Sequence, residues 1–297
     1  MEAFDLVRLR ADAWGMRSRE YGEVCHPGIG PRAEAEALYV HGLRLPERWL
    51  AQPAGEPFVV WDVGLGGGAN ALAVLNAAGA WPVTLRMVSF DRSIEGFDFA
   101  LRHAGELGYF GSLLEPARAW MSEPGVELRH GRARIQWDRV LGDFSTLLAE
   151  ADAWPAPHAI LFDPHSPAAN PEMWTLPVFE GLAARCDPAR PCTLATYSRA
   201  TAVRAALLLA GFRVGMGAAT GTKEETTVAG TTGSRVDGLL GRRWLERAER
   251  STKAEPWRLP PYRDLPLQPE TRERLLAHTQ FAELTPGSPD SPGSRSR

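Results

Sequence analysis

The residues best suited to chemistry are four aspartates that each end or closely follow an apolar run: Asp62, Asp91, Asp143 and Asp163. Such runs are typical of buried parallel strands. In an open α/β sheet, ligands bind beyond the carboxyl ends of the strands, so the four carboxylates are expected at one edge. One aspartate alone could equally be a solvated loop residue or a helix N-cap. Four at successive strand ends indicate a binding site.

A glycine-rich turn directly follows the first of these aspartates. The sequence runs Asp62-Val-Gly64-Leu-Gly66-Gly-Gly68-Ala-Asn70 and enters residues 69–78, which have helix-forming composition. Glycine tolerates positive φ and lets a ligand approach bare backbone, beside the free N–H groups of a helix N-terminus. A pyrophosphate-binding loop reads G-x-G-x-x-G and has no carboxylate so close to its anion. This turn therefore favours a positively charged cofactor such as S-adenosylmethionine; a tight turn without a ligand is the alternative.

Each strand-end carboxylate can be assigned to a different part of that cofactor. Asp62 is expected to orient the methionine amino group, directly or through water. Asp91 is expected to accept both ribose hydroxyls, because a carboxylate has two oxygens. Asp143 is expected to face the adenine amino group, and Asp163 to lie nearest the transferring methyl group. The predicted cofactor-binding residues are Asp62, Gly64, Gly66, Gly68, Asn70, Asp91 and Asp143.

Asp163 also begins a second informative segment, which ends at Trp174 and contains three prolines. Proline fixes φ, so the loop is expected to be stiff and able to hold a catalytic group in place. The Asp-Pro pair resembles the Asp/Asn-Pro-Pro-aromatic loop of amino-methyltransferases. That resemblance implies that Asp163 accepts a hydrogen bond from the amine being methylated and stabilises the developing ammonium. The alternative is a rigid loop in which Asp163 caps the following turn.

Four further residues are candidates for binding the substrate. His165 could act as a general base or be an ordinary loop histidine, and Tyr197 could stack on a base or belong to the core. Lys223 could contact phosphate or be a solvated hairpin lysine. Arg204 is one of several other candidates for contact with RNA. The predicted substrate-binding residues are His165, Asn170, Tyr197 and Lys223.

Alternating strands and helices must position these residues. Strands are predicted from Phe58 and at Leu85–Phe90, Ala133–Leu141, Ala159–Phe162, Thr193–Tyr197, Phe212–Gly217 and Glu225–Ala229, and helices at Ala69–Ala78, Ile94–Leu107, Pro171–Arg185, Arg199–Ala210 and Leu239–Ala248. The pattern predicts an α/β fold with a doubly wound, mostly parallel sheet and an antiparallel C-terminal hairpin. This is the Rossmann-like architecture of class I methyltransferases.

Composition limits the range of functions. We expect residues 1–55 to pack on the core as a lead-in, 56–232 to form the S-adenosylmethionine-binding domain, 233–284 to be an extension and 285–297 a disordered tail. The formal net charge of −3 means that contact with nucleic acid requires a local basic patch. The three cysteines fit neither a disulfide framework nor a zinc site, so no metal is expected. No signal peptide or apolar run of membrane length is evident, so we expect a cytoplasmic protein.

The chain resembles the methyltransferase domain of the MnmC family, which forms 5-methylaminomethyl-2-thiouridine in tRNA. The family loop Gly-Phe-Gly-x-Gly-Leu-Asn is similar to Gly64–Asn70, and its Asn-Pro-Glu-Met-Trp motif is found at Asn170–Trp174. Its Thr-Ala-Thr-Tyr segment resembles Thr193–Tyr197. The chain departs from the family pattern at Pro164, His165, Ala169 and Glu224, where tRNA contacts are expected.

This resemblance implies S-adenosyl-L-methionine as cofactor and the 5-aminomethyl group of a tRNA wobble uridine as methyl acceptor. It implies a stand-alone form without the FAD-dependent oxidoreductase domain found in many family members, with a separate oxidoreductase acting upstream. A methyltransferase acting on another amine is one alternative. A non-catalytic S-adenosylmethionine-binding protein is another.

Overall fold

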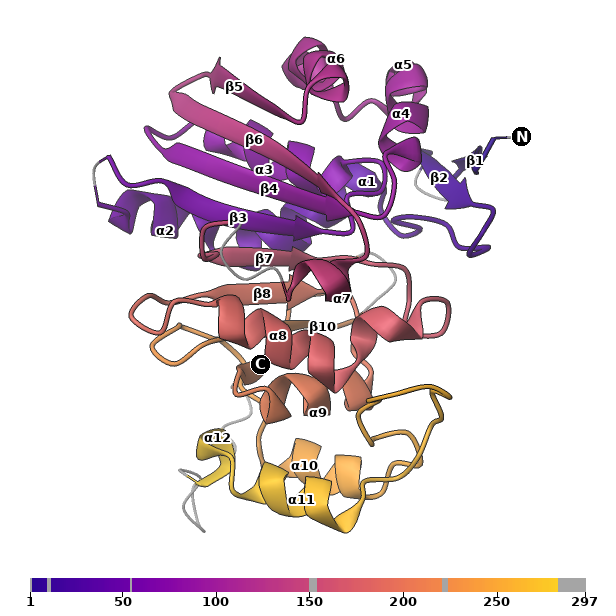
Figure 1. Ribbon diagram of the computed structural model, residues 1–297, viewed down its shortest axis with the longest axis vertical. Coiled ribbons are helices and arrows are strands. Elements are labelled where there is room, and N and C mark those ends of the chain that lie inside the picture. The colour runs from indigo at the N-terminus through magenta and orange to yellow at the C-terminus, as the bar shows by residue number, and fades with distance from the viewer. Residues whose placement is uncertain (1, 10–11, 54, 150–153, 221–223, 283–297) are drawn as a thin grey trace, which may run out of the picture.

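The computed structural model describes residues 2–9, 12–53, 55–149, 154–220 and 224–282, and an eight-stranded sheet lies at its centre (Figure 1). The strands are β1 (Phe4–Arg8), β2 (Trp14–Ser18), β3 (Phe58–Val63), β4 (Thr84–Asp91), β5 (Gly125–His130), β6 (Ala133–Leu141), β7 (Ala159–Phe162), β8 (Thr193–Thr196), β9 (Arg213–Gly217) and β10 (Thr226–Gly230). β1 and β2 form a separate antiparallel hairpin.

Helices connect most of the strands. The α-helices are α1 (Pro31–Ala35), α2 (Leu45–Ala51), α3 (Ala69–Ala78), α4 (Glu95–Arg102), α5 (Ala104–Leu107), α6 (Leu114–Ser122), α7 (Phe144–Leu147), α8 (Leu176–Arg185), α9 (Thr201–Leu209), α10 (Arg242–Glu249), α11 (Pro269–Leu276) and α12 (Thr279–Ala282). A π-helix, η1 (Glu36–His41), and two 3-10 helices, η2 (Gly111–Leu113) and η3 (Pro171–Trp174), complete the set within the described ranges.

The order of the strands confirms the predicted fold class. The sheet runs β5-β6-β4-β3-β7-β8-β10-β9. The five strands from β6 to β8 are parallel, and β10 and β9 form the antiparallel hairpin at one edge. The chain passes from β3 to β4 on one side and later returns to β7 on the other, so the order reverses at β3. Such a switch point opens a crevice at the carboxyl ends of the neighbouring strands.

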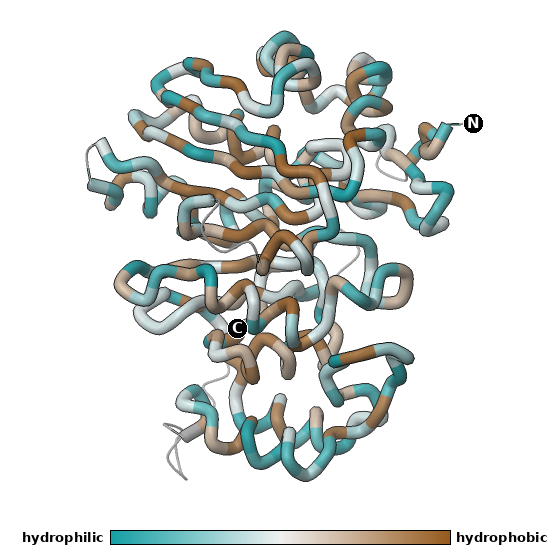
Figure 2. The backbone as a smooth tube through the Cα atoms, viewed as in Figure 1, coloured by the Kyte–Doolittle hydropathy of each residue, from teal (hydrophilic) through white to brown (hydrophobic). Residues whose placement is uncertain are grey.

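Alternate residues of β3 pack into two different cores. Phe58 and Val60 belong to the cluster that contains α3 and α6, whereas Val59, Trp61 and Val63 belong to the cluster that contains α8 and α9. Since both faces are covered, the strand shows a continuous apolar run instead of an alternating pattern. Figure 2 shows the resulting hydrophobic residues along the central strands.

The hairpin of β1 and β2 lies beside α4 and α5, whereas α10 and α11 lie beyond α9 at the bottom of the view (Figure 1). The N-terminal lead-in contributes the buried side chains of Leu38 and Tyr39 to the core around α3. The C-terminal helices contribute Leu245 and Leu275 to the core around α9. The domain boundaries themselves stay a prediction, and residues 285–297 lie outside the described residues. No helix in the described ranges is long and apolar enough to cross a membrane.

Several elements differ from the sequence-based expectation. The helix expected over Ile94–Leu107 divides into α4 and α5, because His103 leaves helical geometry at ψ 26°. The helix expected over Pro171–Arg185 is η3 followed by α8, with Thr175 extended between them. β5 pairs with β6 at the other edge of the sheet and was not expected. Its side chains are half-buried or exposed, so it has no apolar run to reveal it.

Candidate active site

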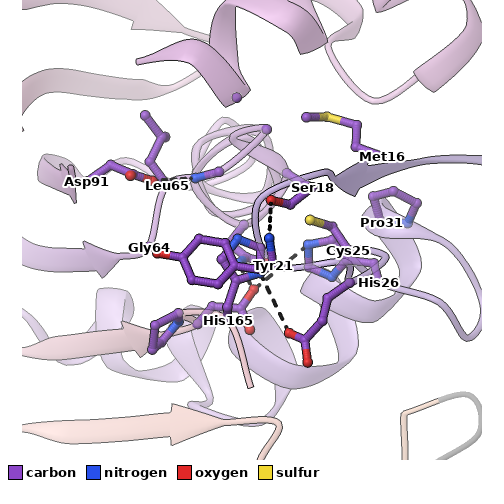
Figure 3. A pocket seen from close by; sticks show the side chains of 18 of the residues that line it. Met16, Ser18, Tyr21, Cys25, His26, Pro31, Gly64, Leu65, Asp91 and His165 are labelled. Carbon is purple, nitrogen blue, oxygen red and sulfur yellow. Dashed lines mark hydrogen bonds and ion pairs between the residues drawn. The ribbon is translucent and has the colours of Figure 1, made fainter. Parts of the chain in front are cut away.

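A large cavity lies at the carboxyl ends of the parallel strands. Its volume is about 620 Å³, within the range of roughly 300–1,000 Å³ usual for small-molecule sites. The turn after β3, Asp91 at the end of β4, Gly142 after β6, Asp163 after β7 and Tyr197 after β8 all line it. Residues from the ends of five strands therefore share one space. Figure 3 shows Gly64, Asp91 and His165 beside side chains of the N-terminal segment.

The glycine turn has the geometry expected of a close-approach loop. Gly64, Gly66 and Gly68 all have positive φ, at 91°, 50° and 78°. A Cβ at Gly64 would lie 2.7 Å from the carbonyl oxygen of Asp163, so glycine is needed to bring the two loops together. A Cβ at Gly66 would meet no heavy atom within 4 Å, because this residue faces the open cavity. The turn thus leaves bare backbone for a ligand at Gly66.

Asp91 lies where a ribose-binding carboxylate is expected. Its Oδ2 accepts a hydrogen bond from the backbone N–H of Gly66 at 2.9 Å, and its Oδ1 accepts one from Ser93. Burial raises the pKa of Asp91, and these backbone N–H groups offset part of that rise. The carboxylate of Asp91 is therefore held on the cavity wall between the glycine turn and Ser93, which lies in the connection from β4 to α4.

Asp62 is not among the residues that line the cavity, and its expected role in orienting the methionine amino group, directly or through water, stays a prediction. The side chain is fully buried, and its Oδ2 accepts a hydrogen bond from Ser89 Oγ at 2.8 Å. Ser89 in turn accepts from Trp137 Nε1. Burial raises the pKa of Asp62 to about 7. Asp62 therefore supports β3 and β4 from within the sheet layer.

Asp143 is also placed differently from the expectation. Its carboxylate is the N-cap of α7 and accepts a hydrogen bond from the backbone N–H of Thr146 at 3.0 Å. The residue is exposed and absent from the cavity lining, whereas its neighbours Gly142 and Phe144 are present there. The alternative interpretation, a helix N-cap, thus describes Asp143, because its carboxylate binds a backbone N–H group of the first turn of α7 that has no partner within the helix.

Asp163 faces the cavity from the loop after β7, with 14% of its side chain exposed. Its Oδ2 accepts a hydrogen bond from Asn70 Nδ2 at 2.6 Å. The Nε2 atom of His26 lies 3.8 Å from the same oxygen. Tyr39 is fully buried on the cavity wall, and burial together with the charge of Asp163 holds its pKa well above the usual range. Asp163 is therefore surrounded by polar groups from three elements.

Hydrogen bonds hold the loop after Asp163 in a fixed shape. The hydroxyl of Tyr197 donates to the carbonyl of Pro164 at 2.8 Å, and Trp174 Nε1 donates to the carbonyl of His165 at 2.8 Å. Asn170 is buried and lines the cavity. The predicted His165, Asn170 and Tyr197 thus lie together around Asp163, and Lys223 falls outside the described residues.

Sequence reasoning missed the N-terminal contribution to this site. Tyr21 stacks on the ring of His165 at 4.0 Å between centroids. The carboxylate of Glu23 accepts hydrogen bonds from both the backbone N–H and the hydroxyl of Ser166. These contacts place the segment between β2 and α1 over the loop that begins at Asp163. The missed signal was a concentration of Tyr, Glu, Cys and His at positions 20–26.

The residues present fit S-adenosylmethionine. The cavity combines the exposed backbone at Gly66 with the carboxylate of Asp91 and with a buried polar atom, Asn70 Oδ1, that has no hydrogen-bond partner among the described residues. Its described lining carries a clear excess of carboxylates over Lys and Arg: Glu20, Glu23, Glu34, Asp91, Glu95 and Asp163 against Arg92. A cationic ligand suits such a lining. Fold and site together define a class I S-adenosylmethionine-dependent methyltransferase.

Comparison with known proteins identifies the family. Residues 115–232 match a family model described as S-adenosyl-L-methionine-dependent methyltransferase. The chain is 35% identical over 223 residues to the tRNA 5-methylaminomethyl-2-thiouridine biosynthesis bifunctional protein MnmC of Ralstonia nicotianae, and 33% identical over 216 residues to that of Methylibium petroleiphilum. Both matches cover 71% of this chain and 32% of the relative, so the chain spans about a third of their length.

Solved structures show the same fold. MNMC2 from Aquifex aeolicus superimposes with a TM-score of 0.68 over 93% of this chain and 85% of that one, at 22% identity. A spermidine synthase superimposes with a TM-score of 0.52 over 92% of this chain and 84% of its own, at 12% identity. The chain therefore contains an S-adenosyl-L-methionine-dependent methyltransferase domain of the MnmC type.

Proposed function

We propose that this chain methylates the 5-aminomethyl group of a tRNA wobble uridine. The observation that carries the proposal is the carboxylate of Asp163, which faces the same cavity as the glycine turn and is fixed by Asn70. The relatives named for 5-methylaminomethyl-2-thiouridine biosynthesis give the substrate class. Asp163 would then be the catalytic residue, and Gly64, Gly66, Gly68, Asn70 and Asp91 would hold the cofactor.

The bound S-adenosylmethionine would supply an electrophilic methyl group on a sulfonium. The protein then has to hold an amine in line with that methyl group, which is chiefly a matter of orientation. Asp163 would accept a hydrogen bond from the amine and stabilise the positive charge that develops on its nitrogen. Tyr197 and Trp174 would contribute indirectly, because their hydrogen bonds to Pro164 and His165 fix the loop.

Contact with RNA has to come from local positive charge. Arg204, one of the candidates, is unsuitable because its side chain is 2% exposed and bonded to Glu225, Thr227 and the carbonyl of Thr226. Arg199 is exposed at the start of α9 and stays a candidate. With a formal net charge of −3, binding is expected to be weak and to depend steeply on salt.

A methyl-transfer assay on hypomodified tRNA tests the proposal. tRNA that carries 5-aminomethyluridine at the wobble position should accept methyl groups, and tRNA with unmodified uridine is the matched control. A parallel titration of tRNA at several salt concentrations should give a slope of roughly 0.7–0.9 for each phosphate contact. Absence of transfer to the aminomethylated tRNA, with S-adenosylmethionine bound, would exclude this substrate.

Two alternatives are distinguished by the same experiments. Transfer to a small amine but not to tRNA would favour a methyltransferase with another amine substrate, which the carboxylate-rich cavity also suits. Binding of S-adenosylmethionine without any transfer would favour a non-catalytic binding protein. If tRNA is the substrate, we propose that an upstream oxidoreductase supplies the aminomethyl group and that the protein acts in the cytoplasm.

A further inference from the structure

His26 lies between two carboxylates on the wall of the cavity. Its Nδ1 is 3.8 Å from Glu34 Oε2, and its Nε2 is 3.8 Å from Asp163 Oδ2. The side chain is 15% exposed. The backbone of His26 has φ 51°, in the left-handed region that few non-glycine residues occupy. Strained backbone of this kind is concentrated at active sites, where the surrounding structure has to enforce it.

Glu34 holds the turn that follows His26. Its Oε1 accepts hydrogen bonds from the backbone N–H groups of Gly28 and Ile29, at 2.6 and 3.0 Å. One carboxylate therefore fixes the turn after His26 and still presents its second oxygen to the imidazole. Carboxylates lie 3.8 Å from both ring nitrogens, but Asp163 Oδ2 already accepts a hydrogen bond from Asn70, so we assign the ring proton to Nδ1, beside Glu34, and a lone pair to Nε2. Nε2 is the ring nitrogen that lies near Asp163.

Two hydrogen-bond acceptors, His26 Nε2 and Asp163 Oδ2, then lie close together on the cavity wall. Nε2 and Asp163 Oδ2 are too far apart for a hydrogen bond to one another. They are close enough to accept two hydrogens from one amine nitrogen placed between them. Asn70 holds the Asp163 oxygen from the other side at 2.6 Å. The arrangement is therefore a receptor for a group that donates more than one N–H.

We infer that His26 accepts the proton of the substrate ammonium, while Asp163 holds the same nitrogen in place. An alkyl ammonium has no lone pair and cannot attack a methyl group until it loses a proton. In this step an N–H bond of R–NH3⁺ breaks, its electron pair stays on nitrogen, and the proton bonds to His26 Nε2. The products are R–NH2 and an imidazolium, so charge is conserved, and Glu34 stabilises the imidazolium. This inference rests on the proposed function, because it requires an amine substrate.

Other titratable groups around the site are less suitable. Burial raises the pKa of Cys25 to about 12 and holds that of Tyr39 well above its usual range, so both stay protonated at neutral pH. Glu23 is engaged by Ser166. His165 also has a carboxylate near its Nδ1, Glu23 at 3.6 Å, but its ring stacks on Tyr21 with 4.0 Å between centroids. His26 is the histidine for which a contact with Asp163 is seen.

The rate test compares His26→Gln with His103→Gln as matched control. His103 lies outside the cavity lining and has its Nδ1 3.6 Å from Glu106, so it mimics a histidine beside one carboxylate. On aminomethylated tRNA, His26→Gln should lower kcat by about 100-fold near pH 7, the lower end for loss of a general base. The loss should shrink as pH rises, because a free amine needs no base. A loss that is equal at every pH, or no loss, would overturn the inference.

A second measurement needs neither cofactor nor activity. Nitrogen-15 NMR of the histidine side chains should show His26 with its proton on Nδ1 and a bare Nε2, its signals being assigned by their disappearance in His26→Gln. Glu34→Gln should raise the share of the Nε2–H tautomer. A wild-type Nε2–H tautomer, or an imidazolium that persists through the pH range of activity, would overturn the inference. If wild-type protein transfers no methyl group to any amine, the proposed function fails, and this spectrum still decides the role of Nε2.

Unchanged folding has to be shown for the variants. His26→Gln should keep its thermal midpoint and its affinity for S-adenosylhomocysteine within about twofold of wild type, because the inference gives His26 a contact with the acceptor amine and none with the cofactor. A variant that loses both would report misfolding, and His26→Asn would then replace it in the rate test. An Asn variant that also shows a pH-independent loss would overturn the inference.

Discussion

The sharpest prediction concerns Asp163→Asn, which removes the charge of the proposed catalytic carboxylate and keeps its shape. The side chain is 14% exposed, so an effective dielectric constant of about 20 is appropriate. Two unit charges about 4 Å apart then attract by about 4 kcal/mol. If half of the ammonium charge has developed in the transition state, the loss is about 2 kcal/mol, or roughly 30-fold in kcat.

The contact with Asn70 makes the variant more severe than this figure. Asn70 Nδ2 donates to Asp163 Oδ2 at 2.6 Å, so the new amide has to turn its oxygen toward Asn70. Its NH2 group would then face the substrate amine as a second donor. We therefore expect a loss between about 2 kcal/mol and the 4 kcal/mol typical of removing one electrostatic group from an active site.

The assay is single-turnover methyl transfer to aminomethylated tRNA, with S-adenosylmethionine affinity measured in parallel by calorimetry. Asp143→Asn is the matched control, because Asp143 is exposed and caps α7 outside the cavity. It should leave stability nearly unchanged, because Asn caps a helix about as well as Asp does, and it should leave turnover unchanged. Wild-type turnover in Asp163→Asn would refute the assigned role, and so would an equal loss in both variants.

Three further outcomes are expected. Gly66→Leu should lose S-adenosylmethionine binding in calorimetry, because its Cβ points into open cavity, and the φ of 50° at this position should also cost some stability. Retained affinity would argue against the cofactor lying there. Burial raises the folded-state pKa of Asp62 to about 7, so the unfolding free energy of the wild type should fall as pH rises from about 4 to about 7. Asp62→Asn should abolish this fall, as measured by urea titrations across the range. Identical profiles for the two proteins would show that Asp62 titrates normally. Glu23→Ala should free the backbone N–H of Ser166, and faster hydrogen exchange at that amide, with Glu20→Ala as control, is the measurement; unchanged protection would show that Glu23 does not hold this loop.

The sequence by itself determined the framework and the two loops at its active edge. The apolar run that becomes β3, the glycines after it and the stiff loop from Asp163 each act through their own backbone preferences. For the same reason the bounds expected for β6, β7 and α3 agree with the structure. The carboxyl ends of the strands could be located from the sequence, and a doubly wound sheet brings these ends to one edge. Proximity of Gly64 to Asp163 follows from that topology.

The tertiary structure alone decided which polar side chains reach the cavity. Asp62 and Asp143 have the same local signature as Asp91, yet one bonds to Ser89 inside the sheet and the other caps α7. When both faces of a strand are apolar, the sequence does not alternate between apolar and polar residues. It therefore does not show to which face of the sheet a given side chain points. The contact of His26 with Asp163 could not be found from the sequence, although His26 belongs to the polar segment at positions 20–26. It is 137 positions from Asp163, and a contact over that separation depends on the folded path of the whole chain between them.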